Sequence, residues 1–139
     1  MGKMRKRGLQ LPENGIICIV DNYLAEVNIG NLRPEIMVAE LLLLSAGEVD
    51  EIRIWQPSSP EKVILQKVNF DGRGVATRTT GALVLSLSKR ELDHWLHYFL
   101  RFYRDGIPEV DHLDLEVLDD RGSVAYSVTV KVDIESIAL

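Results

Sequence analysis

The chain of 139 residues has one cysteine and no hydrophobic run long enough to cross a membrane. The single thiol, Cys18, rules out a disulfide framework within one chain. Because it lies inside the apolar run Ile16–Val20, we expect it to be buried and unreactive. No charged segment precedes an apolar stretch with a small-residue cleavage site. These absences predict a cytoplasmic protein with no membrane association.

Common motifs of enzyme sites are also missing. The sequence has no Gly-x-Gly-x-x-Gly after a strand, no phosphate-binding loop, no Gly-x-Ser-x-Gly and no His-Glu-x-x-His. The segment Asp71-Gly72-Arg73-Gly74 could cradle a phosphate, but a hairpin turn accounts for it fully. We therefore expect no cofactor.

The charge is unevenly distributed. The net charge is -5, and four cations near the start form a basic cluster: Lys3, Arg5, Lys6 and Arg7. Without them, 16 − 4 = 12 basic residues stand against 21 acidic ones, which gives the remainder a net charge of -9. Such an acidic body disfavours nucleic-acid binding, which depends on cations that contact phosphates. We expect residues 1–14 to be a disordered basic tail and residues 15–139 to form one domain.

A helix is predicted between Leu87 and Ile107. Ser88 and Glu91 have the spacing of a capping box, and Gly106 followed by Pro108 ends the helix. Apolar residues recur between them with a period of 3.6: Leu92, Trp95, Leu96, Phe99, Leu100 and Tyr103. This spacing predicts that these six side chains form the face that packs on the core.

A second helix is predicted between Pro34 and Gly47, which suit its first position and its C-terminal cap. Its polar residues are few, namely Glu35, Glu40 and Ser45, so it is apolar on nearly all sides. Two interpretations follow: a central core helix, or a helix through whose segment Ile36–Leu44 two copies associate.

The remaining apolar segments alternate or are short, as in strands. We expect strands at Ile16–Val20, Ala25–Ile29, Glu51–Trp55, Lys62–Phe70, Val75–Thr79, Ala82–Leu87, His112–Leu118 and Val124–Val132. Turn residues at 21–23, 71–74, 80–81 and 119–122 predict hairpins between neighbouring strands.

The elements repeat in the order ββαββ, over residues 15–71 and 72–139. After each helix comes Glu-Val-Asp followed by alternating Ile or Leu, at Glu48–Ile54 and at Glu109–Leu115. An internal duplication would give a pseudo-twofold domain. We predict an α+β fold in which two helices pack on one or two antiparallel sheets of about eight strands in total.

The three histidines lie close together in the sequence. His94 and His97 are neighbours on one helical face, and His112 alternates with Asp114 and Glu116 on one face of a strand. If the two faces converge, these histidines could hold a metal ion for hydrolysis. Solvent-exposed histidines without a ligand are the favoured interpretation.

The stretch Leu83–Val132 combines an amphipathic helix, a strand that opens His112-Leu113-Asp114, and a hairpin to a β-branched last strand. In this it resembles some small bacterial immunity proteins, which neutralise toxins. The resemblance implies a non-enzymatic inhibitor that binds a toxin by charge and shape, and an acidic body would favour association with a basic toxin domain. The duplicated units also resemble single-strand nucleic-acid binders of the whirly type, which the acidic charge disfavours.

The partner-binding surface is predicted on the second helix and the strand after it. Tyr98 and Phe102 lie off the predicted core face beside Arg101, and exposed aromatics with an arginine are typical of interfaces. Phe102 could instead contact Ile107 at the end of the helix. The candidates for partner binding are Asp93, Tyr98, Arg101, Phe102, Asp114 and Glu116.

Three functions follow from the sequence. The first is a protein-binding module, most concretely an immunity-type inhibitor of a toxin. The second is a homodimeric structural or assembly subunit. The third is a small metal-dependent enzyme that uses His94, His97 and His112.

Overall fold

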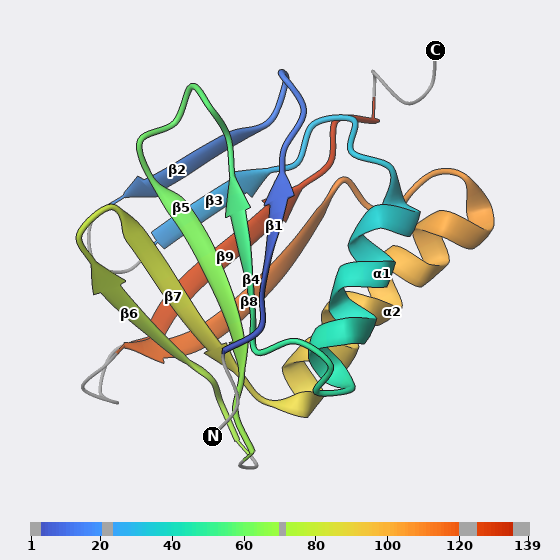
Figure 1. Ribbon diagram of the computed structural model, residues 1–139. Helices are drawn as coiled ribbons and strands as arrows, with labels where there is room; N and C mark the ends of the chain where they lie inside the picture. The colour runs from blue at the N-terminus through green and yellow to red at the C-terminus, as the bar shows by residue number, and fades with distance from the viewer. Residues whose placement is uncertain (1–3, 21–23, 70–71, 120–124, 135–139) are drawn as a thin grey trace.

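The computed structural model describes residues 4–20, 24–69, 72–119 and 125–134. It has an α+β fold with two helices, α1 (Pro34–Ser45) and α2 (Lys89–Asp105) (Figure 1). The strands are β1 (Lys6–Gln10), β2 (Ile16–Val20), β3 (Leu24–Asn28), β4 (Glu51–Trp55), β5 (Lys62–Lys67), β6 (Val75–Thr79), β7 (Ala82–Leu87), β8 (His112–Asp119) and β9 (Ala125–Lys131). Among the described residues, neither helix is long and apolar enough to span a bilayer.

The strands form one mixed sheet in the order β1-β4-β5-β7-β6-β8-β9-β3-β2. Neighbours β1 and β4, β5 and β7, β6 and β8, and β3 and β9 are parallel, whereas the other pairs are antiparallel. The expectation of a purely antiparallel sheet is therefore wrong. Local turn signals identify hairpins but do not determine how one hairpin pairs with the next.

The predicted hairpin of β5 and β6 across Asp71–Gly74 is also wrong. β5 pairs in parallel with β7, with Lys62 opposite Ala82, and β6 pairs with β7 across the turn at Thr80-Gly81. This arrangement aligns the buried residues of β5, Val63 and Leu65, with Leu83 and Leu85 of β7. Burial of this apolar row favours the parallel pairing.

The strand β1 lies in the segment that was expected to be a disordered tail. It pairs in parallel with β4, from Lys6 opposite Glu51 to Gln10 opposite Trp55. Leu9 is buried, and the Arg7 guanidinium forms a bidentate interaction with the buried carboxylate of Glu40 on α1, at 2.8 and 3.1 Å from Nε. The ion pair between Arg7 and Glu40 thus helps to hold β1 in place, although the sequence of this segment shows only a cluster of basic residues.

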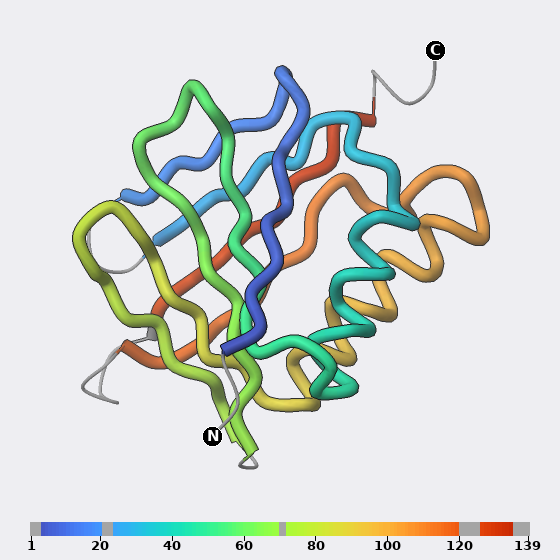
Figure 2. The backbone as a smooth tube through the Cα atoms, viewed as in Figure 1, coloured from blue at the N-terminus to red at the C-terminus, as the bar shows by residue number. Residues whose placement is uncertain are grey.

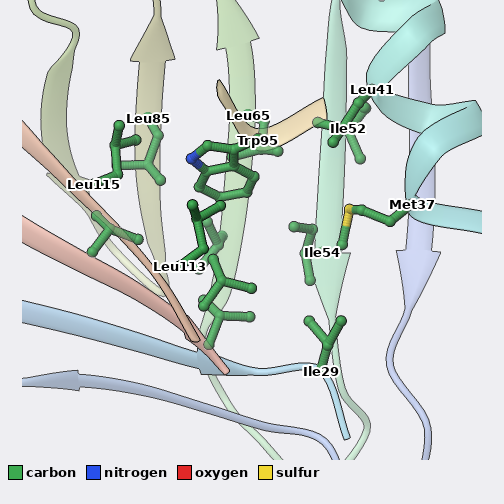
Figure 3. Close-up of a cluster of buried hydrophobic side chains, with 14 of the residues drawn as sticks. Ile29, Met37, Leu41, Ile52, Ile54, Leu65, Leu85, Trp95, Leu113 and Leu115 are labelled. Atoms are coloured by element: carbon green, nitrogen blue, oxygen red, sulfur yellow. The ribbon is translucent and has the colours of Figure 1, made fainter. Parts of the chain in front are cut away.

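Figures 1 and 2 show that the sheet curls around the core, with α1 and α2 side by side and antiparallel along one side. The side chain of Trp95 lies among Leu65, Leu85, Leu113 and Leu115 (Figure 3). Trp95 is fully buried, and its indole nitrogen has no hydrogen-bond partner among the described residues. The indole of α2 therefore anchors this helix to both halves of the sheet.

The buried face of α2 differs from the predicted one. Phe102 is only 2% exposed, whereas Leu100 and Tyr103 are 41% and 59% exposed. The buried residues Leu92, Trp95, Phe99 and Phe102 also follow a helical period, so periodicity fits both stripes. Periodicity alone therefore does not decide whether Phe102 or the pair Leu100 and Tyr103 is buried, and the packing of the helix in the fold decides it.

The helix α1 covers the sheet with one face only. Met37, Leu41 and Leu44 are buried, but Ile36 and Leu42 remain 39% and 48% exposed. The interpretation of α1 as a central core helix is therefore wrong, although its sequence is apolar on nearly all sides.

The strand β2 is an edge strand, and its outward face is apolar. Ile16, Cys18 and Val20 are all exposed on this face. The expectation that Cys18 is buried is wrong, because only alternate residues of β2 point toward the core.

Candidate functional site

A surface groove runs between α2 and β8. One part has a volume of about 460 Å³ and is lined by His94, His97, Tyr98, Arg101, Val110, His112, Leu113 and Asp114. An adjoining part of about 480 Å³ shares His94 and is lined further by Gly72, Arg73, Arg90, Glu91, Leu115 and Glu116. We call the two parts together the α2–β8 groove. Both volumes lie within the range of about 300–1,000 Å³ that is usual for binding pockets.

The groove exists because β8 is paired along only part of one edge. Its neighbour β6 reaches β8 only at Leu118 and Asp119, and no other described strand pairs with that edge. On the other side, β9 pairs with β8 from His112 to Leu118. Among the described strands, the six residues from His112 to Val117 therefore have a paired neighbour on one side alone.

The direction of the unpaired backbone groups follows from the ladder. The Asp111 carbonyl accepts a hydrogen bond from Val132 of the β9 side, and Leu118 donates to Gly74 on the opposite side. Since backbone groups alternate along a strand, the N–H and C=O groups of His112, Asp114 and Glu116 point away from β9. They form the edge of β8 that faces the α2–β8 groove.

The start of α2 is fixed by the predicted capping box, which is confirmed. The Glu91 carboxylate accepts from the Ser88 amide at 3.0 Å, and the Ser88 hydroxyl accepts from the Glu91 amide at 3.4 Å. Gly74 packs against this cap, since a Cβ there would lie 2.7 Å from Glu91 Oε1 and 2.4 Å from the Ser86 carbonyl oxygen. The close approach of Gly74 holds α2 against the sheet at one end of the groove.

Tyr98 closes the other end. Its hydroxyl donates to the Val110 carbonyl at 2.6 Å, and its ring meets Phe99 edge-on with centroids 5.1 Å apart. Burial, and then the negative charge of Asp111, raise the pKa of Tyr98 to about 12. Tyr98 is therefore a half-buried wall of the groove, held in place by an intramolecular hydrogen bond.

Several charged groups of the groove have partners within the chain. Arg101 pairs with Glu109 at 2.8 Å, and Glu116 pairs with Arg73 at 3.1 Å. Asp114 accepts a hydrogen bond of 2.8 Å from the Thr129 hydroxyl. These contacts are exposed, so they cost little to exchange for contacts with a partner.

His112 lies between two carboxylates at the edge of the groove. Its Nδ1 lies 2.8 Å from Asp111 and its Nε2 lies 3.4 Å from Asp114. The hydrogen bond to Asp111, and then the charges of Asp114 and Asp111, raise the pKa of His112. The same hydrogen bond lowers the pKa of Asp111.

The groove brings His94, His97 and His112 together along one lining. Within the described ranges, no group of three or more His, Cys, Asp or Glu side chains is placed to hold a metal ion. His94 and His97 are exposed on α2, and His112 is engaged with carboxylates.

Of the six predicted partner-binding residues, four line the α2–β8 groove: Tyr98, Arg101, Asp114 and Glu116. Asp93 does not line it and pairs with Lys89 at 2.9 Å. Phe102 belongs to the core, because its side chain is buried in the hydrophobic cluster rather than exposed to solvent. It is therefore not available to a partner on this surface.

The sequence did not indicate the unpaired edge of β8, nor the contributions of Arg90, Leu113 and Leu115 to the groove. One sequence signal could have pointed to this edge. The Glu-Val-Asp repeat places β8 and β4 at matching positions after their helices, so that their edges can be compared. Comparison with protein-family models, with curated proteins and with solved structures found no match to this chain.

Proposed function

We propose that this protein is a non-enzymatic protein-binding module whose partner occupies the α2–β8 groove, and that it acts as an immunity-type inhibitor of a bacterial toxin. The observation that carries the proposal is a groove that combines an unpaired strand edge with Tyr98, Arg101 and three histidines. Aromatic and arginine side chains around an apolar floor are the residue types that dominate protein interfaces.

The charge of the whole chain supports a basic partner. Because Arg5 and Arg7 form ion pairs with Asp50 and Glu40, they belong to the folded body. From residue 4 onward the chain has 15 basic and 21 acidic residues, a net charge of -6. A net charge of this sign speeds the encounter with a cationic toxin domain, and salt screens the effect.

We infer further that the fold arose by duplication of a ββαββ unit. After β1, the elements run β2-β3-α1-β4-β5 and then β6-β7-α2-β8-β9. Both helices are followed by a glycine with positive φ, Gly47 at 79° and Gly106 at 76°. The Glu-Val-Asp segments then lead into β4 and β8.

A binding measurement tests the proposed function. The candidate partner is the toxin domain encoded next to this protein in its genome, and calorimetry gives its affinity. The double variant His97→Glu, Arg101→Glu should weaken binding by at least about 2 kcal/mol, the scale of an interface hot spot. The matched control is Lys62→Glu on β5, outside the groove, which should change affinity by less than about 0.5 kcal/mol. Equal losses in both variants would place the interface elsewhere.

A homodimer is the second candidate function, because Ile36 and Leu42 remain exposed on α1. Exposed apolar side chains on one helix face are suited to helix-to-helix association. Light scattering of the purified protein tests this candidate: a dimer that Leu42→Glu converts to a monomer would support it, and a parent protein that is monomeric at every concentration would exclude it.

A further inference from the structure

We propose that the partner binds as an added strand, parallel to β8, along the edge from His112 to Glu116. This inference rests on the proposed function and specifies how the groove holds its partner. The bound segment is extended, five residues long, with an acidic second residue and an apolar fourth residue.

The chain itself contains an example of this arrangement. β1 lies on β4, the strand that follows α1, as the proposed segment would lie on β8, the strand that follows α2. The Arg5 carbonyl accepts from the amide of Glu51 at 3.3 Å, and the Leu11 amide donates to the Trp55 carbonyl at 2.8 Å. A parallel strand therefore fits beside a helix in this fold.

The two edges correspond residue by residue. Aligning Glu48-Val49-Asp50 with Glu109-Val110-Asp111 places Glu51 to Trp55 on His112 to Glu116. The residues Glu51 to Trp55 make up the whole register of β1 on β4. The residues His112 to Glu116 lie within the part of β8 that lacks a described strand neighbour on the corresponding side. On both strands the first, third and fifth residues direct their backbone groups toward this edge.

The side chains of β1 show which positions of an added strand face the helix. Arg7, the second residue, reaches the buried Glu40 on α1, and Leu9, the fourth, is buried. They lie opposite Ile52 and Ile54, which correspond to Leu113 and Leu115 in β8. The second and fourth residues of a segment on β8 would thus enter the α2–β8 groove above those two leucines.

The groove favours an acidic second residue. Where α1 presents the carboxylate of Glu40 to the arginine of β1, α2 presents His97 and Arg101 beside Leu113. A carboxylate at this position would receive charge-assisted hydrogen bonds from these groups. The fourth residue would cover Leu115 and is therefore apolar.

A peptide derived from β1 tests the inference. The probe is the peptide of residues Met4–Leu11 carrying Arg7→Glu, and the matched control is the same peptide with Arg7 retained. Nuclear magnetic resonance of the full chain should show binding of the probe at least about tenfold tighter than the control. Hydrogen exchange should slow at the amides of His112, Asp114 and Glu116, and a spin label on the peptide N-terminus should broaden signals near His112 rather than Glu116.

A proline variant separates strand addition from other binding. Asp114→Pro removes an edge amide without removing a backbone hydrogen bond to β9, and it should abolish probe binding. Asp114→Asn keeps this amide and an oxygen that can accept from the Thr129 hydroxyl, so it should bind the probe far more tightly than the proline variant does. Absence of probe binding in the parent chain would overturn the inference. Probe binding that perturbs only α2, with unchanged exchange on β8, would also overturn it. Either result leaves the proposed function to be decided by the toxin-binding measurement.

Discussion

At the scale of single residues, Asp111 and His112 make stability depend on pH. The raised pKa of His112 stabilises the fold below its ordinary value of 6.5, and this contribution disappears as pH rises through the raised value. The lowered pKa of Asp111 contributes above its ordinary value of 3.8 and is lost on acidification. In Asp111→Asn, a resonance titration should show the pKa of His112 falling toward 6.5. An unchanged titration midpoint would mean that the contact does not form in solution.

The cap of α2 allows a second residue-scale prediction. Ser88 is buried, and its hydroxyl satisfies the third amide of the helix. Ser88→Ala should reduce the free energy of unfolding by about 1 kcal/mol, the usual loss for an N-cap serine. Ser88→Asp, which retains a capping oxygen, provides the comparison in urea denaturation, and equal midpoints for parent and alanine variant would place the helix start elsewhere.

At the scale of elements, the rotation of α2 about its axis determines which residues reach a partner. Phe102→Ala should cost about 3–5 kcal/mol, as expected for a buried aromatic side chain. Leu100→Ala, at a position 41% exposed, should cost less than about 1 kcal/mol. Thermal unfolding of the two variants distinguishes the observed buried face from the one that periodicity predicts. If the predicted face were the buried one, Leu100→Ala would cost more stability than Phe102→Ala.

The attachment of β1 depends on the ion pair between Arg7 and Glu40. Arg7→Ala leaves the buried Glu40 carboxylate without its guanidinium partner, so we expect a clear loss of stability. The double variant Arg7→Ala, Glu40→Leu removes the unpaired charge and should recover part of this loss. A double variant that is less stable than Arg7→Ala would show that the charge pair does not hold β1 on β4.

The sequence predicted those elements whose signals are local. The capping box at Ser88 and Glu91, the glycine cap at Gly106 and the hairpin of β2 and β3 depend on neighbouring residues and were found as expected. The parallel pairing of β5 with β7 depends on contacts between distant segments, which no local pattern encodes. The free edge of β8 follows from that sheet order, so Tyr98, Arg101 and Asp114 could be proposed individually but not as parts of one groove.

At the scale of the whole molecule, β8 has an edge beside α2 that no described strand covers from His112 to Glu116, whereas β1 covers the corresponding edge of β4. Native-state hydrogen exchange of the free protein measures this difference directly. The amides of His112, Asp114 and Glu116 should exchange rapidly while those of Leu113 and Leu115 are protected, and in β4 both Arg53 and Ile54 should be protected. Uniform protection from His112 to Glu116 would contradict a free edge on β8, because it would mean that the edge is already covered.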